Sequence, residues 1–225
     1  MPVSARTRDW AELWIGYGLI LVVVWTPNPE QRVLYWIAVA FVAVTAWLRR
    51  RETRPNGFGL KGLVPSLWVV GVAVAALFAA IGVASRLHTL HPLYGPLPVA
   101  AHILAYTLWA LMQQFILQVY VLLRLLRVGL RRRWAIALAA VLFAIAHVPN
   151  PVLAPVTLAW GAATSLLYLR YRNLYALALA HGILGMALAV CIPNSVHHHM
   201  RVGLGYVQYS EHQHWTRRET LLFPR

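Results

Sequence analysis

Polar side chains that could do chemistry are few in this chain, and they stand inside apolar stretches: Gln113, Gln114, Gln118, His147 and His181. A neutral histidine can accept a proton near pH 7. A glutamine amide donates two hydrogen bonds and accepts through its oxygen, but it has no comparable basicity. Such a set can bind and orient a substrate, stabilise an oxyanion and, at a histidine, remove a proton from water.

The stretch that holds the glutamines has the spacing of an α-helix with a polar stripe. One face carries residues that follow one another at steps of four, three and four: His102, Tyr106, Trp109 and Gln113. Gln114 and Gln118 lie four residues apart on the neighbouring face. Hydrogen bonding between helices is the alternative explanation of such a stripe. Three glutamines within six residues favour a functional pocket.

The composition places these helices in a membrane. Of the 225 residues, 60% are hydrophobic and 12% are charged, whereas a typical soluble domain has roughly 45–50% apolar and about 25% charged residues. The 20 basic residues outnumber 6 acidic ones and lie between apolar runs, which is typical of membrane orientation and not of nucleic-acid binding. The single cysteine, Cys191, excludes an internal disulfide and a multi-cysteine zinc site. We expect no metal and no other cofactor.

Seven apolar stretches approach or reach the length of about 20 residues that a spanning helix needs. They cover residues 11–26, 33–48, 64–84, 99–123, 134–148, 152–169 and 174–192. The expected fold class is therefore all-α, a polytopic membrane bundle of about seven transmembrane helices. The first stretch follows Arg6 and Arg8, as in a signal peptide, but no Ala-x-Ala cleavage pattern comes after it. We expect an uncleaved first helix.

Basic residues concentrate in the connections at 49–62 and 124–133, each of which holds five. Because short cytoplasmic loops carry the excess of Lys and Arg, both connections are expected to face the cytoplasm of an integral protein of a bacterial-type cytoplasmic membrane. Counted at about 1.5 Å per residue from these helix ends, four residues all fall at middle depth in the bilayer: Gln113, Gln114, His147 and His181. Residues from three separate helices thus meet the requirement for a site within the bundle.

The chain is expected to divide into a helical bundle over 1–192 and a tail over 193–225 that is rich in His, Arg and aromatic residues. The tail is interpreted as a lid or surface appendage. Three consecutive histidines at 197–199 cannot all point one way, and His212 and His214 share a face only in a strand. Surface or interfacial histidines are therefore favoured over a metal site.

The order of these motifs resembles the CPBP family of intramembrane endopeptidases, which includes the CAAX prenyl proteases and bacteriocin-processing enzymes. The similarity covers about residues 99–190, and its family motifs are Glu-Glu-x-x-x-Arg, Phe-x-x-x-His and His-x-x-x-Asn. The segment from Phe143 to His147 is similar to the second motif. The segment from Asn173 to His181 is similar to the sequence that ends in the first histidine of the third motif. The first motif reads Gln-Gln-x-x-x-Gln here, and the third ends in Gly185.

The resemblance implies both a site and a class of substrate. In the family a motif glutamate is taken to activate the attacking water, while the histidines and the Asn assist and stabilise the oxyanion. The implied catalytic set in this chain is Gln113, Gln114, Gln118, His147 and His181, with Phe143, Gly185 and Tyr106 in the surrounding pocket or oxyanion region. The implied substrate is a prenylated or otherwise lipidic peptide, and the residues alone are equally compatible with a non-peptide lipid.

The missing carboxylate bears directly on the chemistry, because a Gln cannot serve as a general base. All the acidic residues lie outside the matching region: Asp9, Glu12, Glu30, Glu52, Glu211 and Glu219. Only Glu211 and Glu219, in the tail, offer an acid that could fold back over the site.

Three alternatives stay open. The chain is a binding or regulatory module that has lost peptidase chemistry, or a divergent enzyme in which neutral His147 or His181 is the base. The third alternative is a transporter or channel whose polar stripe lines a pathway, and it has the least support because no inverted repeat is visible. The hydrogen-bonding capacity kept at all three glutamines favours a polar pocket inside the bilayer.

Overall fold

The computed structural model describes residues 4–52, 56–92 and 98–209, and within these ranges every regular element is a helix. The helices are α1 (Ala5–Trp25), α2 (Glu30–Leu48), α3 (Leu63–Arg86), α4 (Val99–Gln114), the π-helix η1 (Phe115–Leu122), α5 (Leu123–Arg127), α6 (Arg132–Ile145), α7 (Leu153–Tyr171), α8 (Tyr175–Cys191) and α9 (Asn194–His197). Residues 203–209 are also helical. The predicted all-α fold class is confirmed.

Local chemistry explains where several helices begin and end. At the start of α1, the Ser4 hydroxyl accepts a hydrogen bond from the Thr7 amide at 3.1 Å, which satisfies one of the free amides of the first turn. Prolines stand in the connections after α1, α6 and α8, at 27 and 29, at 149 and 151, and at 193. Because proline lacks an amide hydrogen and its ring clashes with the preceding turn, these residues separate the apolar stretches into distinct helices.

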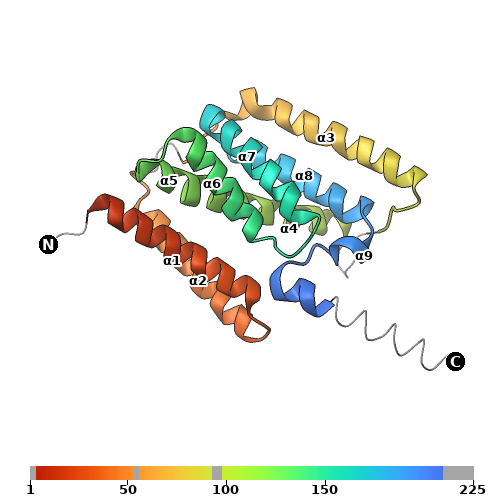
Figure 1. The fold of residues 1–225 in the computed structure, drawn as a ribbon. Helices are drawn as coiled ribbons and strands as arrows, with labels where there is room; N and C mark the ends of the chain where they lie inside the picture. The colour runs from red at the N-terminus through yellow and green to blue at the C-terminus, as the bar shows by residue number, and fades with distance from the viewer. Residues whose placement is uncertain (1–3, 53–55, 93–97, 210–225) are drawn as a thin grey trace.

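The helices form a bundle with two flanking units (Figure 1). The antiparallel pair α1–α2 lies along one side, and α3 packs on α8 at the opposite edge. Between them, α6 packs against α7 and α4 against α8. The continuous helical stretch α4–η1–α5 runs through the middle and meets α1, α2, α6 and α7, so it is the element that connects the two sides.

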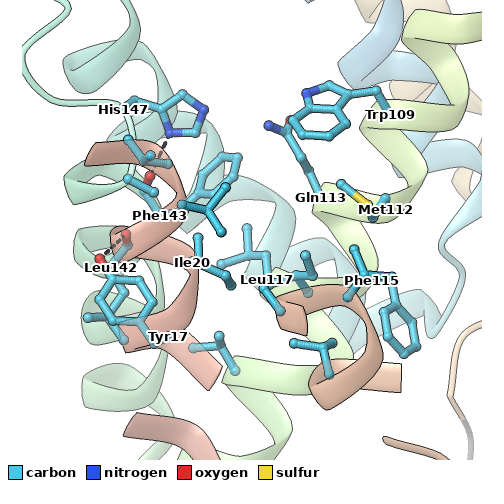
Figure 2. A pocket seen from close by; sticks show the side chains of 18 of the residues that line it. Tyr17, Ile20, Trp109, Met112, Gln113, Phe115, Leu117, Leu142, Phe143 and His147 are labelled. Carbon is cyan, nitrogen blue, oxygen red and sulfur yellow. Dashed lines mark hydrogen bonds between the residues drawn. The ribbon is translucent and has the colours of Figure 1, made fainter. Parts of the chain in front are cut away.

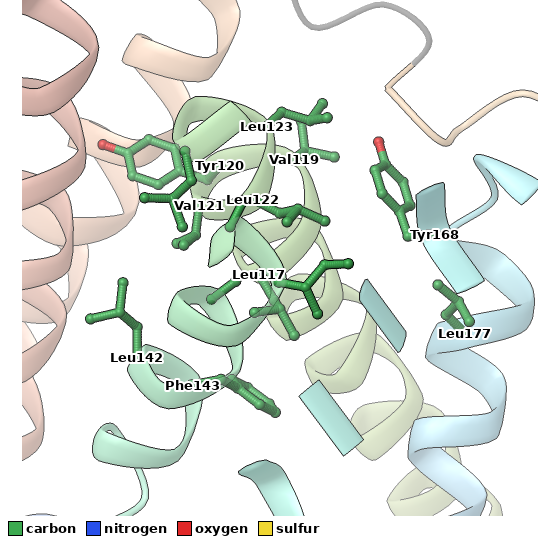
Figure 3. Packing of buried hydrophobic residues seen from close by; sticks show 14 of the residues in the cluster. Leu117, Val119, Tyr120, Val121, Leu122, Leu123, Leu142, Phe143, Tyr168 and Leu177 are labelled. Atoms are coloured by element: carbon green, nitrogen blue, oxygen red, sulfur yellow. The ribbon is translucent and has the colours of Figure 1, made fainter. Parts of the chain in front are cut away.

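The buried core is centred on η1 (Figure 3). Residues 117–122 are all buried, and Leu122 and Tyr120 are completely inaccessible. They pack against Phe143 of α6 and Tyr168 of α7, which belong to the same apolar cluster. A π-helix closes i to i+5 hydrogen bonds and has a wider turn than an α-helix, and such turns are frequent at functional sites. Here the wide turn begins directly after Gln114.

A group of ion pairs joins α1 to α5 at the end of the bundle where α1 starts. Arg124 is completely buried and contacts Glu12 at 3.0 Å, and Arg127 contacts Asp9 at 2.9 Å. Tyr120 donates to the Glu12 carbonyl at 2.6 Å. This approach is open because residue 16 is glycine, whose missing side chain leaves room for the Tyr120 hydroxyl.

The outer surface is strongly apolar, as a bilayer requires. Large side chains are widely exposed on α2 and α3, with Trp36 67%, Trp47 66% and Phe78 67% accessible. Three helical stretches of the described part are long and apolar enough to span a membrane: Glu30–Leu48, Leu63–Arg86 and Val99–Arg127. A fourth is added if the bent pair Tyr175–Cys191 and Asn194–Met200 counts as one span. A helical membrane bundle is therefore supported, whereas the number of seven crossings, their orientation and the division at 192 stay predictions.

The buried charge of Arg124 leads to a prediction about the free energy of unfolding. We expect Glu12→Leu to lower the free energy of unfolding by about 3–5 kcal/mol, because it leaves a buried guanidinium without its counter-charge. Glu52→Gln is the matched control: it removes the exposed partner of Arg8, and we expect a loss below about 1 kcal/mol. Denaturant titration in mixed micelles measures both. Equal losses in the two variants would contradict the structural role assigned to Glu12.

Candidate intramembrane site

A cavity of about 470 Å³ lies among α4, α7, α8 and the segment that follows α6. Helix α4 contributes Tyr106, Trp109 and Gln113 to its wall, and α8 contributes His181 and Gly185. Further lining residues are His147, Thr157, Trp160, Met200 and Val202. Residues far apart in the sequence therefore surround one space.

The tautomer of neutral His147 is fixed by its own turn. Helix α6 ends at Ile145, and His147 Nδ1 lies 2.7 Å from the carbonyl oxygen of Phe143. A carbonyl oxygen can only accept, so in the neutral imidazole Nδ1 carries the hydrogen and Nε2 carries the lone pair. The Phe143 ring packs edge-on against the imidazole, with centroids 4.8 Å apart. The histidine therefore has a base-capable nitrogen left over after its structural bond is made.

His181 is bonded from the opposite side, through glutamines that lie behind the cavity wall. Gln114 and Gln118 are completely buried, and neither lines the cavity. Gln114 Nε2 lies 3.2 Å from His181 Nδ1, and Gln118 Nε2 lies 3.1 Å from Gln114 Oε1. Gln118 Nε2 also lies 3.1 Å from the Thr164 hydroxyl of α7. The glutamine pair thus supports His181 instead of facing a substrate.

Gln113, unlike Gln114 and Gln118, lies in the cavity wall. It lines the cavity, is only partly buried and makes no hydrogen bond to any described residue. Its amide is therefore available to a ligand, both as a donor and as an acceptor. Of the three motif glutamines, only Gln113 is placed to touch a substrate.

The Tyr106 side chain packs directly against the backbone of Gly185. A Cβ placed on residue 185 would collide with the Tyr106 ring and hydroxyl. The aromatic side chain of α4 thus fills the place that a longer side chain on α8 would take. Tyr106 brings a hydroxyl donor to the cavity wall at this point.

A second cavity, of about 320 Å³, adjoins the first (Figure 2). Its walls come from α1, α2, η1 and α6 and are almost entirely apolar, with Tyr17, Ile20, Leu117 and Phe143 among them. Four residues line both cavities: Trp109, Gln113, His147 and Val202. Figure 2 shows His147 and Gln113 on facing walls at one end of this space. The polar and the apolar cavity therefore share a boundary at these two residues.

Asn150 is a structural residue that sequence reasoning missed. Its Oδ1 accepts from the amides of Val152 and Leu153 at 3.0 and 2.9 Å and so caps α7. Its Nδ2 donates at 2.9 Å to the carbonyls of His197 and Arg201. The side chain thus ties the segment after α8 to the turn that carries His147. An Asn between two prolines was the available signal, since this residue type favours turns and caps.

His197 and His198 are buried, so these two tail histidines take part in packing and do not lie at the surface. His197 Nε2 lies 2.8 Å from the Ile192 carbonyl, and the His198 ring stacks on Tyr206 with centroids 4.1 Å apart. Among the described residues no group of three or more His, Cys, Asp or Glu side chains is arranged to hold a metal ion. His212 and His214, and the acids Glu211 and Glu219 that were considered as substitutes for the missing carboxylate, lie outside the described residues.

The described acidic residues do not reach the cavities. No Asp or Glu of ranges 4–52, 56–92 and 98–209 lines either space. Asp9 and Glu12 are bonded to arginines at the end of the bundle, as is Glu52. The chemistry available within the described walls is therefore that of histidine, amide and hydroxyl groups.

An all-helical bundle with membrane-spanning helices and polar groups gathered around a buried cavity defines a polytopic membrane protein with a candidate site between its helices. The sequence model of the family described as type II CAAX prenyl endopeptidase Rce1-like matches residues 65–187, and the chain belongs to this family. The match starts within α3, earlier than the similarity expected from about residue 99. No curated protein and no solved structure matches the chain.

The cap and anchor at Asn150 lead to a prediction about the site's outer wall. We expect Asn150→Ala to lower the free energy of unfolding by about 1–3 kcal/mol, because it removes a helix cap and leaves two carbonyls without their donor. Hydrogen exchange should become faster in residues 194–209 and in the first turn of α7, while α3 keeps its protection. Asn28→Ala, at an exposed position in another connection, is the control. Unchanged exchange in 194–209 would contradict the anchoring role.

Proposed function

We propose that this protein is a membrane-embedded hydrolase of the prenyl-endopeptidase type in which a histidine replaces the carboxylate as general base. The observation that carries the proposal is the hydrogen bond from His147 Nδ1 to the Phe143 carbonyl, at 2.7 Å. It leaves Nε2 with a lone pair on a residue that lines the cavity. A neutral imidazole has the basicity that the glutamines lack.

The proposed reaction uses the groups of the cavity wall in distinct roles. His147 Nε2 takes a proton from a water molecule while the water oxygen forms a bond to the carbonyl carbon of the substrate. The carbonyl π electrons move to oxygen, and this oxyanion accepts hydrogen bonds from Tyr106 and His181. When the tetrahedral intermediate collapses, the carbon–nitrogen bond breaks and the imidazolium returns its proton to the leaving amine. Gln113 orients the peptide through its free amide.

A lipidic peptide is the substrate class that this arrangement supports best. The apolar cavity adjoins the polar one at His147 and Gln113, so an isoprenoid or acyl chain in the former would leave a neighbouring peptide bond in the latter. A lipid chain that enters from the bilayer exchanges one apolar environment for another, so it gains little of the roughly 0.8 kcal/mol per methylene group that transfer from water would give. The apolar cavity would thus position the lipidated peptide and select it by shape, while the polar wall supplies the chemistry.

The second candidate function is a binding module on the same scaffold. It is favoured by one specific observation, namely that no described acidic residue lines either cavity. In this case a lipidated peptide would be held by the apolar cavity and by Gln113 without being cleaved. In the hydrolase, loss of His147 would abolish formation of a cleavage product. In the binding module, it would affect only the binding of the ligand.

We expect His147→Ala to lower turnover by about 10²–10⁴-fold, because the general base is lost. Tyr106→Phe should lower turnover by about 10²–10³-fold, because one oxyanion donor is removed. The measurement compares the peptides and lipids of membranes that contain wild-type protein or a variant at equal abundance. A cleavage product should be present with wild type and reduced in both variants.

His88→Ala provides the control, since His88 is exposed and lines neither cavity. It should leave the product at the wild-type level. Identical peptides and lipids with wild type, His147→Ala and Tyr106→Phe would reject the hydrolase and favour the binding module.

A further inference from the structure

We propose that Gln118 and Gln114 form a directional hydrogen-bond relay that fixes His181 as the tautomer with hydrogen on Nε2. In this role Gln114 and Gln118 are positioning residues, and His181 is a hydrogen-bond donor rather than a base. The assignment of the tautomer stands on the hydrogen-bond geometry alone. The use of the donor, to stabilise an oxyanion, rests on the proposed function.

The direction of the relay is set at Thr164. Its hydroxyl donates to the carbonyl of Trp160 at 2.8 Å, one turn earlier in α7. A hydroxyl has only one hydrogen to donate, so toward Gln118 the Thr164 oxygen acts as an acceptor. The 3.1 Å contact between Gln118 and Thr164 must then be made by the amide nitrogen of Gln118, whose N–H donates.

The same nitrogen also fixes the orientation of the Gln114 amide. Gln118 Nε2 has a second hydrogen, and it points to Gln114 Oε1 at 3.1 Å. Because this oxygen is engaged by a donor, the other end of the Gln114 amide, Nε2, is the one that faces His181 Nδ1 at 3.2 Å. An amide NH₂ group donates and does not accept, so Nδ1 must carry a lone pair. The hydrogen of the neutral imidazole is therefore on Nε2.

The reversed relay leaves a worse defect in the core. With both amides turned round, Thr164 would donate to Gln118, and the NH₂ group of Gln118 would lose both of its acceptors. In the observed direction, Gln118 Oε1 is the only buried side-chain atom of Gln114, Gln118 and Thr164 that has no hydrogen-bond partner. One acceptor without a partner costs less than two N–H donors without partners in an environment that has no water.

The relay gives the two histidines of the cavity complementary states. His147 has its hydrogen on Nδ1, bonded to Phe143, and a lone pair on Nε2. His181 has its lone pair on Nδ1, bonded to Gln114, and its hydrogen on Nε2. The Phe143 ring packs against both imidazoles, with centroids 4.8 and 6.0 Å away. One imidazole is thus prepared to accept a proton, and the other is prepared to donate a hydrogen bond.

A carboxylate at position 114 would act in the opposite sense. It accepts hydrogen bonds only, so it would draw the hydrogen of His181 to Nδ1 and leave the lone pair on Nε2. The glutamine pair therefore does more than remove an acid from the site, because it reverses the hydrogen-bonding character of the neighbouring histidine.

Nitrogen NMR of the full-length protein in lipid bilayers, labelled with ¹⁵N in its histidines, tests the relay. The His181 signals are identified by their loss in His181→Gln. We expect a single pair of signals, with Nδ1 shifted as a bare imidazole nitrogen and Nε2 as a protonated one. Gln118→Met, which removes the orienting donor with little change in volume, should give two sets of His181 signals for the two tautomers, although residue 118 does not touch His181. Gln113→Leu, in the same continuous helical stretch α4–η1–α5 but outside the relay, should keep the single set of His181 signals.

Protonated Nδ1 in the wild-type spectrum would overturn the relay without the need for any variant. An unchanged single set in folded Gln118→Met would overturn it as well. If the methionine variant does not fold, Thr164→Val removes the acceptor that sets the direction and should give the same doubling of signals.

The outcomes separate this inference from the proposed function. Expected tautomers in a protein that cleaves no substrate would reject the hydrolase and leave the relay standing. If cleavage occurs, Gln118→Met should lower kcat several-fold and leave KM unchanged, because a donor to the oxyanion acts only in the transition state. An unchanged kcat together with mixed tautomers would show that His181 is not the donor.

Discussion

Inside an apolar bundle, a buried polar group depends on other polar groups of the protein for its hydrogen bonds, because lipid hydrocarbon and apolar side chains offer none. The arrangement around the cavity follows from this constraint. Phe143 satisfies one nitrogen of His147, and Gln114 satisfies one nitrogen of His181. Each imidazole then presents its remaining nitrogen with a fixed character. The pre-organisation of the site is thus a consequence of the need to satisfy buried polar groups.

The same constraint explains where the acidic side chains are used. Arg124 is completely buried and requires a counter-charge, which Glu12 of α1 provides. These carboxylates hold the α1–α2 pair against η1 and α5, and α1 and α2 form one wall of the apolar cavity. Asp9 and Glu12 therefore hold α1, whose residues line the apolar cavity, against α5. No described acidic side chain lines the neighbouring polar cavity, whose polar groups include His147, His181 and Gln113.

The sequence predicts the helical framework well, because apolar length and polar spacing are local properties. Each of the seven apolar stretches overlaps a helix. The types and spacing of His147, His181 and the glutamines, together with the family resemblance, predict a site among these helices. The roles of the glutamines could not be predicted in this way. Whether Gln114 faces the cavity or supports His181 depends on how α4 and η1 turn relative to α8. The meeting of Tyr106 with Gly185, the anchor at Asn150 and the pairing of Glu12 with Arg124 likewise depend on contacts between distant segments.

The proposed role of His147 is to activate water for the cleavage of a lipidated peptide without a carboxylate. This role can be tested with a prenylated peptide that is incubated with the purified protein in vesicles suspended in ¹⁸O-labelled water. We expect one labelled oxygen in the new carboxyl group for each bond broken, and loss of this product with His147→Ala. A peptide that binds to the vesicle-embedded protein but stays intact and unlabelled would contradict it.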